Sequence, residues 1–154
     1  KGKSHVLRVI RDILTFQPTG KGKRIEAGVE FMGRISRRKT VGFLLSDFHA
    51  KGWESTLRIA RRRHDLVPVV VTDPLEEQLV PGGFMAFEDP KNGQIVWRHT
   101  SRSFLKRFAN VATESRQETE RTFRRMNMDF IHLRTGEPYT QALLRYFRRR
   151  ARRH

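Results

Sequence analysis

The chain has 154 residues, 37% of them hydrophobic and 31% charged, so it is long enough to bury a core and form one domain. It contains no cysteine, which excludes disulfides and a thiol nucleophile, and no apolar run approaches the roughly 20 residues of a membrane-spanning helix. Its 32 lysines and arginines against 16 acidic residues give a net charge of +16, which predicts attraction to polyanions such as nucleic acid or anionic lipid.

Two helices are predicted ahead of the first strand. Apolar residues recur at helical spacing over 4–16, behind Ser4 as an N-cap, and indicate an amphipathic helix that packs on the core. The connection that follows contains Gly20-Lys-Gly-Lys23, which resembles a phosphate-binding loop. It lacks the P-loop spacing and the Lys-Ser/Thr ending, so we interpret it as the entry to a second helix over 25–35.

The apolar run from Val41 to Leu45 ends abruptly on Ser46 and Asp47. Apolar residues at successive positions are typical of a parallel strand that helices cover on both faces. Ligands of open α/β sheets bind just beyond the carboxyl ends of such strands. Asp47 therefore either caps the helix that follows or faces a ligand, and the residues alone leave both roles open.

A second strand and a second acid follow. A helix over 53–63 ends in three arginines, and a strand over 67–72 has Pro68 near its start and Asp73 just after its end. Strand, helix and strand together describe a βαβ unit with a right-handed crossover. The pattern predicts an α/β fold built on a mostly parallel sheet.

The remaining elements are predicted from turn signals and periodicity. Asn92-Gly93 marks the turn of an antiparallel hairpin at the edge of the sheet. A long polar helix over 101–126 covers a sheet face, and a short strand occupies 129–133. Pro138 opens a closing helix that ends in an arginine tail.

The order of these elements resembles the domain of unknown function 58 family. The resemblance covers essentially the whole chain and rests on the segments VGFLLSDF, RRRHDLVPVVVTDP, EEQLVPGGFMAFEDPKNG and YTQALLRYFRRR. Its most specific pieces lie at 46–48, 62–74 and 76–83. The resemblance implies a bacterial protein, often encoded beside a MoxR-type AAA ATPase, with a von Willebrand factor A-like, Rossmann-like domain.

The resemblance also implies that residues 1–154 are the C-terminal part of that domain and begin after its Asp-x-Ser-x-Ser strand. Asp47 matches the last acid of the family's metal-ion-dependent adhesion site. The threonine of that site is missing, because Gly22-Lys-Arg24 stands in its place and Thr19 is out of register. One aspartate cannot hold Mg²⁺, so we expect no cofactor in this chain and at most Mg²⁺ in the longer family members.

The implied function is a protein-interaction module, without enzymatic activity, that meets a MoxR-type ATPase. The surface expected to make this contact lies at the top of the sheet and comprises Ser46, Asp47, Phe48, His49 and Asp73. The location implied is the cytoplasm, with a tether to the inner membrane where family members carry upstream membrane helices. Because the neighbour of strand 41–45 would be missing, self-association through that strand's edge is also expected.

Two other functions compete with this one. Binding to an anionic surface, either nucleic acid or the inner membrane leaflet, would use the helix ends at Arg61, Arg62, Arg63, Arg148, Arg149 and Arg150. An enzyme would have to draw on Asp47, Asp73, His49 and His64. No nucleophile-base set or metal-ligand spacing joins those four residues, so catalysis is not expected.

Overall fold

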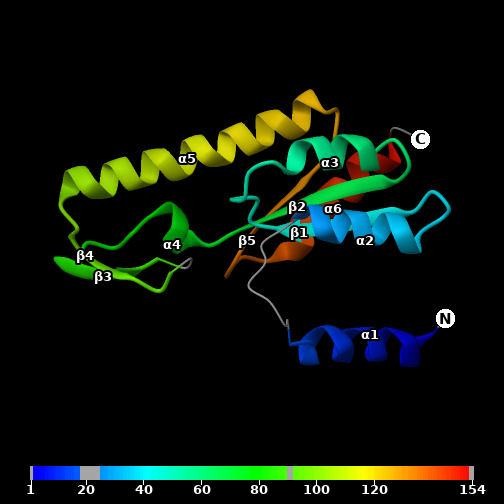
Figure 1. Cartoon of the computed structure of the whole chain (residues 1–154), viewed down its shortest axis with the longest axis horizontal. Helices are drawn as coiled ribbons and strands as arrows, with labels where there is room; N and C mark the ends of the chain where they lie inside the picture. Colours follow the sequence, from blue (N-terminus) through cyan, green and yellow to red (C-terminus); the bar gives the residue numbers. More distant parts are fainter. Residues whose placement is uncertain (1, 18–24, 90–91, 153–154) are drawn as a thin grey trace.

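A computed structural model of the chain describes residues 2–17, 25–89 and 92–152. Its main sheet has three strands in the order β1-β2-β5, formed by β1 (Val41–Ser46), β2 (Asp65–Thr72) and β5 (Ile131–Arg134) (Figure 1). Both pairings are parallel, with Val41 opposite Asp65 and Val69 opposite Ile131. The predicted α/β class, with a mostly parallel sheet flanked by helices, is confirmed.

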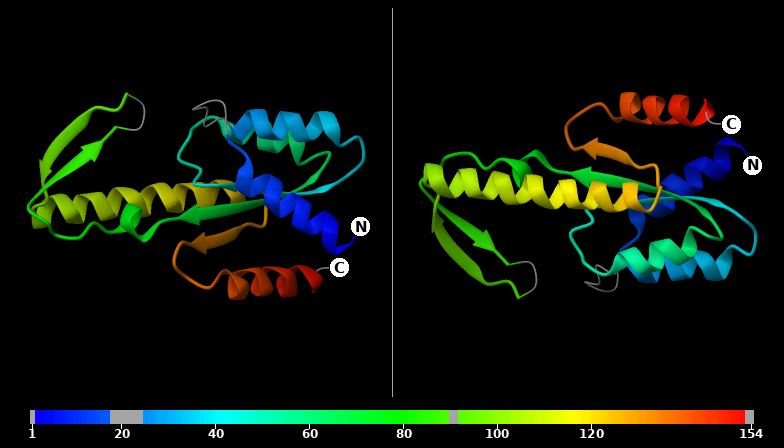
Figure 2. Two further views of the ribbon diagram at one scale, coloured as in Figure 1. Left: turned by 90° about the horizontal axis from the view of Figure 1, so that it is seen from below. Right: turned by 90° about the horizontal axis from the view of Figure 1, so that it is seen from above.

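Helices cover the two faces of this sheet unequally. On one face lie α2 (Ile25–Ile35), α3 (Trp53–Ala60) and the C-terminal end of α5 (Arg102–Arg125); on the other lies α6 (Tyr139–Ala151) (Figure 2). The larger core forms on the first face and consists of Ile25, Val29, Phe48, Trp53, Leu57, Leu66, Val70, Phe123, Met126 and Met128. The smaller core forms under α6 from Val67, Val69, Ile131 and Tyr146.

Strand β2 is the central strand and is buried almost throughout. Pro68 was predicted near the start of this strand but lies in its middle, opposite Leu44. The backbone N–H of Asp65 donates to Thr40 O on the β1 side, whereas Thr72 O accepts the backbone N–H of Thr135 on the β5 side. The backbone groups of the even-numbered residues of β2 therefore point toward β5. Pairing with β5 begins only at Val69. The missing N–H of Pro68 therefore costs no ladder hydrogen bond.

The hairpin forms a separate two-stranded sheet. Strands β3 (Phe84–Glu88) and β4 (Ile95–His99) pair antiparallel with each other and with no other described strand, which corrects the prediction that they extend the edge of the main sheet. The hairpin lies beside the N-terminal half of α5, where the rings of Phe87 and Phe104 are 6.0 Å apart (Figure 1). The hairpin therefore packs against α5 and does not form the predicted ladder of hydrogen bonds with the main sheet.

Helix α1 (Lys3–Thr15) forms at the predicted place but does not pack as predicted. None of its residues is buried, and its apolar side chains, from Val6 to Leu14, are exposed. Ser4 lies inside the helix, and Gly2 occupies the N-cap position without a side-chain hydrogen bond. The Gly20–Lys23 loop, Thr19 and the 22–24 segment fall outside the described residues.

Candidate interaction site

The end of β1 turns sharply through Asp47 and Phe48. Ser46 Oγ accepts the N–H of Phe48 at 3.1 Å, and Asp47 Oδ1 accepts the N–H of His49 at 3.1 Å. Asp47 therefore closes a turn in its own loop. Of the two roles left open for it, helix capping is ruled out for α3, whose N-cap is Gly52 with no side-chain hydrogen bond. Asp47 and His49 remain exposed at the surface.

Phe48 was predicted to contact a partner and instead belongs to the core. Its side chain is 4% exposed, and its ring packs edge-on against Trp53 at 5.2 Å and Phe123 at 5.0 Å. The backbone of Phe48 has φ 56°, an uncommon conformation for a bulky residue, which turns the ring inward between two exposed neighbours. Packing of this ring in the core fixes the loop that carries Asp47 and His49.

Asp73 caps the short helix α4 (Pro74–Glu77) at the end of β2. Its Oδ1 accepts the N–H of Leu75 at 2.8 Å, with Pro74 at the first helical position, and its Oδ2 accepts the hydroxyl of Thr135 at 2.8 Å. The hydrogen bonds from Leu75 and Thr135, helped by the nearby Arg134 charge, hold the pKa of Asp73 below its ordinary value. The carboxylate is thus kept ionised and oriented at the carboxyl end of the sheet.

An ion-pair network behind Asp73 joins three elements. Glu77 of α4 pairs with Arg116 of α5 and, through Oε2, with Arg134 of β5 at 3.2 Å. Arg134 also pairs with Glu137 at 3.1 Å. The side chains of Glu77, Arg116 and Arg134 are about two-thirds or more buried, so this network is less screened than a surface pair. It fixes α4 against α5 and the end of β5.

A second contact at this end joins Thr72 of β2 to His132 of β5. Thr72 Oγ1 and His132 Nε2 share a hydrogen bond of 2.9 Å. Sequence reasoning missed this pair and the contact of Glu77 with Arg116, because the partners lie 60 and 39 residues apart in the chain and carry no spacing motif. Thr72 is buried, and its hydroxyl is engaged by His132.

We use the term carboxyl-end surface for the polar side chains of Asp47, His49, Asp73 and Glu76, of which Asp73 is half-buried and the others are exposed. His49 Nε2 lies 3.6 Å from Glu76 Oε2, which links the loop after β1 to α4. The hollow that Asp47, His49 and Glu76 line has a volume of about 30 Å³, room for a water molecule and far below the 300 Å³ or more of a typical small-molecule site. The geometry suits contact with a surface better than enclosure of a substrate.

The described residues around Asp47 do not supply the set of oxygen ligands that the adhesion site implies. Mg²⁺ needs several oxygen ligands converging on one point. Within the described part of the chain, no group of three or more histidine and acidic side chains lies close enough together to hold a metal ion. Asp47 is the one adhesion-site residue matched here, and its Oδ1 is already engaged by His49 N–H.

Comparison with known proteins identifies the family. The profile described as "Protein of unknown function DUF58" matches residues 1–118. The chain belongs to this family. Residues 46–48 and 62–74, which include Asp47, Asp73 and the central strand behind them, therefore lie within the matched region.

The curated relatives are mycobacterial and uncharacterised. Uncharacterized protein Rv1480 of Mycobacterium tuberculosis is 25% identical over 154 residues, covering 98% of this chain and 49% of the relative. Uncharacterized protein MAV169 of Mycobacterium avium is 24% identical over 136 residues, covering 88% and 80%. The DUF58 chain thus spans about half the length of the first of these. No solved structure matches it.

The remaining predicted site residues lie elsewhere on the DUF58 chain. Arg61, Arg62 and Arg63 are exposed beyond α3, and Arg148 and Arg149 are exposed on α6. Arg150 is held by Asp65 and donates to the Tyr146 hydroxyl at 2.7 Å. His64 is buried at the amino end of β2, so the structure does not bring it together with Asp47, Asp73 and His49. Among the helices described, none is long and apolar enough to cross a bilayer.

Proposed function

We propose that this chain is a von Willebrand factor A-like protein-interaction module, without enzymatic activity, that contacts its partner through the carboxyl-end surface. The observation that supports the proposal most is the fixed presentation of Asp47, His49 and Asp73 at the carboxyl end of the sheet, with a hollow of only about 30 Å³ beside Asp47 and His49. Asp47 and Asp73 are oriented by backbone N–H groups, and Phe48 anchors the loop from below. Preorganised polar groups lose little conformational entropy on binding.

The partner we propose is a MoxR-type AAA ATPase, in complex assembly or maturation. This choice follows from the family resemblance, in which the two kinds of protein are often encoded together. We also propose a cytoplasmic location, with a tether to the inner membrane in longer family members. Acidic Asp47, Asp73 and Glu76 would face a basic or hydrogen-bond-donating patch of the ATPase, because complementary charges steer encounter and fix register.

The test is direct binding to a MoxR-type ATPase from the same genome, measured by biolayer interferometry with and without ATP. We expect the double variant Asp47→Asn, His49→Ala to weaken binding about tenfold or more, since two interface hydrogen bonds to charged groups are lost. The amide oxygen of the introduced asparagine can still accept the N–H at residue 49, so the loop keeps its shape. Asp12→Asn on α1 is the matched control and should leave the dissociation constant unchanged, because Asp12 pairs among the described residues only with its neighbour Arg11. Equal binding by the double variant and the wild type would disprove this surface.

Binding to an anionic surface is the second candidate. The exposed Arg61–Arg63 run, exposed Arg148 and Arg149, and the net charge of +16 favour it. Such binding would be independent of sequence and would fall with a slope of about −0.9 per neutralised phosphate in a plot of log affinity against log salt. Sequence-selective binding to DNA or RNA that survives about 0.3 M salt would place this function ahead of the first.

The proposal assigns no metal to Asp47. Titration calorimetry with Mg²⁺ should give no saturable heat with this chain. A micromolar site that disappears in Asp47→Ala would contradict the assignment and would make the carboxyl-end surface a metal-dependent one.

A further inference from the structure

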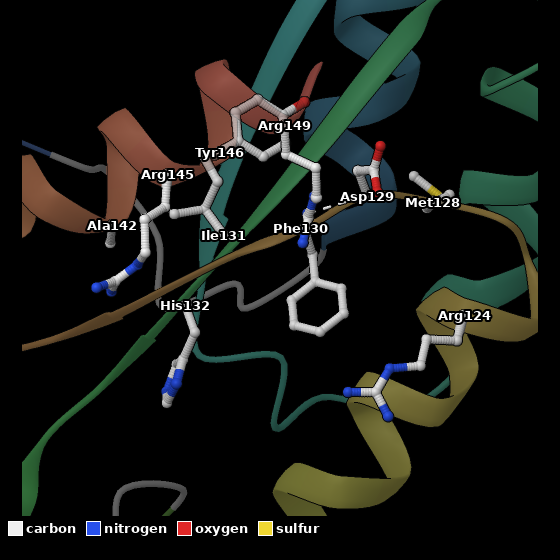
Figure 3. A pocket seen from close by; sticks show the side chains of 10 residues that line it. All are labelled: Arg124, Met128, Asp129, Phe130, Ile131, His132, Ala142, Arg145, Tyr146 and Arg149. Carbon is white, nitrogen blue, oxygen red and sulfur yellow. Dashed lines mark ion pairs between the residues drawn. The ribbon is translucent and has the colours of Figure 1, made fainter. Parts of the chain in front are cut away.

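A groove runs along the outer edge of β5, between the C-terminal end of α5 and one face of α6 (Figure 3). Its volume is about 370 Å³. The α6 wall is built from Ala142, Arg145, Tyr146 and Arg149, which recur at intervals of three and four residues and so share one helix face. Hollows of about 330 Å³ and 290 Å³ adjoin it, sharing Arg145 at one end and Tyr146 at the other, so the groove follows the strand.

The floor of the groove is an unpaired strand edge. Among the described strands, β5 pairs with β2 alone. Thr135 donates its N–H to Thr72 O at 2.9 Å, and Leu133 O accepts from the Thr72 hydroxyl, so residues 131, 133 and 135 direct their amide groups toward β2. Backbone groups alternate in direction along a strand. His132 and Arg134 therefore direct theirs outward, into the groove.

The walls of the groove are basic. Arg145 has no ion-pair partner among the described residues, while Arg149 reaches Asp129 at 3.5 Å and Arg124 pairs with Glu120 of its own helix at 3.0 Å. All three line the groove, Arg145 and Arg149 on the α6 side and Arg124 on the α5 side (Figure 3). Arginine side chains form paired hydrogen bonds with carboxylates, so the groove favours an acidic ligand.

The α5 side also offers apolar surface. Phe130 and Met128 line the groove there, and the Arg124 guanidinium lies over the Phe130 ring at 5.9 Å. A strand placed beside β5 would direct alternate side chains toward α6 and toward α5. The two walls therefore match a segment that alternates acidic residues, facing Arg145 and Arg149, with apolar residues facing Phe130.

We propose that this groove binds an extended acidic segment of a partner protein, which adds to the sheet as a fourth strand beside β5. Main-chain hydrogen bonds with His132 and Arg134 would supply affinity, and the alternation of the two walls would supply specificity, as in other cases of strand addition. A peptide fits better than nucleic acid, because the open backbone of His132 and Arg134 can pair with the N–H and C=O groups of a peptide main chain, and a phosphodiester backbone has no N–H donor. The site is separate from the carboxyl-end surface and stands independently of the function proposed above.

The probe is a fluorescein-labelled peptide of eight residues that alternates Glu with Val, and binding is measured by fluorescence anisotropy with the full chain. We expect saturable binding that Arg145→Gln weakens about five- to tenfold, since one charge-assisted contact is lost without breaking an ion pair of the fold. Arg148→Gln removes an equal charge from the same helix, outside the groove, and should change the dissociation constant by less than about twofold. Replacing the peptide's Glu residues by Gln should weaken binding by more than Arg145→Gln does, because the contacts with all the groove arginines lose their charge.

Strand addition is tested separately from charge by two further peptides that keep every carboxylate. One is N-methylated on the odd residues and the other on the even residues, so that each loses the donors on one edge. We expect one of the two to bind as the parent peptide does and the other to fail. Equal binding by both, equal effects of the two arginine variants, or competition by a dT₈ oligonucleotide at equal affinity would each overturn the proposal, the last in favour of nucleic acid. Absence of saturable binding by the parent peptide would overturn it outright.

Discussion

The two edges of the main sheet are built differently. At the β5 edge, α5 and α6 rise on either side and place arginines around the open backbone (Figure 3). At the β1 edge, Val41, Phe43 and Leu45 present an apolar face that is 53%, 46% and 64% exposed. Charged side chains deter unselective pairing at a sheet edge, and an apolar edge invites it. Among the described elements, the sheet therefore has one edge walled by arginines and one edge that presents apolar side chains.

The position of α6 explains the difference between the two edges. Its core contacts are with β2 and β5, through Tyr146 against Val67, Val69 and Ile131. The contact of α6 with β1 is smaller and is made by the rings of Phe147 and Phe43, whose centroids are 6.2 Å apart. Strand β1 was predicted to be covered on both faces, and only its Leu44 face is packed against the core. A run of apolar residues in the sequence indicates which side chains of a strand would be stabilised by burial. It does not show whether another element of the chain packs over them.

The largest expected effect concerns the two faces of β1. Leu44 packs against the larger core and Leu45 faces outward, so the same substitution should have different consequences at neighbouring positions. We expect Leu44→Ala to lower the free energy of unfolding by about 2 kcal/mol, from lost burial and a residual cavity. Leu45→Ala should change it by less than about 0.5 kcal/mol. Urea denaturation of the two variants would decide, and equal losses would mean that β1 is covered on both faces.

The second prediction concerns self-association through the β1 edge. We expect the chain to self-associate, and Leu45→Lys to raise the dissociation constant about tenfold or more, which is about 1.4 kcal/mol, because a charge would be buried at each new pair of edges. Leu144→Lys on α6 makes the same change at an exposed leucine away from that edge and should have no such effect. Sedimentation equilibrium measures both. A monomeric wild type would show that the apolar edge is harmless as it stands.

The third prediction concerns the attachment of α6, on which the groove at β5 depends. Arg150 pairs with Asp65 at the start of β2, with side chains 26% and 32% exposed. We expect a double-mutant cycle of Arg150→Gln and Asp65→Asn to give a coupling energy of about 1 kcal/mol. The Arg11–Asp12 pair of α1, with side chains 68% and 59% exposed, should give a value near zero and serves as the reference. Equal coupling in the two pairs would mean that the Arg150 contact does not hold α6.

Sequence reasoning located the elements of the main sheet well, because strand-to-acid endings and helical periodicity are local signals. β1, β2, α2 and α5 formed within a few residues of the predicted ranges. The placement of Asp47, His49 and Asp73 beyond the same ends of parallel strands followed from chain order alone. The positions of these residues follow from the sheet topology, and the βαβ pattern in the sequence predicts that topology.

Interactions that depend on packing could not be predicted in this way. The Phe48 ring turns inward because of one backbone angle, and Glu77 meets Arg116 and Arg134 only once α4, α5 and β5 are assembled. The basic groove likewise combines Arg124 from one helix with Arg145 from another. Each arginine, taken alone in the sequence, is indistinguishable from a solvated helix end.

The smallest expected effect concerns Asp73, whose carboxylate accepts a hydrogen bond from the hydroxyl of Thr135, the residue after β5. Its pKa in the folded chain lies below the ordinary value, through the Leu75 N–H first and the Thr135 hydroxyl second. A lowered folded pKa means that the fold favours the ionised form. The resulting stabilisation is present above the unfolded pKa of about 3.8 and is lost as pH falls through the folded value.

Thr135→Val removes one of the two hydrogen bonds to Asp73, so the pKa of this carboxyl should rise and the loss of stability in acid should be shallower. Carboxyl ¹³C titration by NMR would measure the shift. Thr15→Val is the control that leaves Asp73 unchanged, because the native Thr15 hydroxyl donates to Arg11 O within its own helix. An unchanged titration in Thr135→Val would show that the Leu75 N–H alone orients this carboxylate, and that the carboxyl-end surface is held by α4 without help from β5.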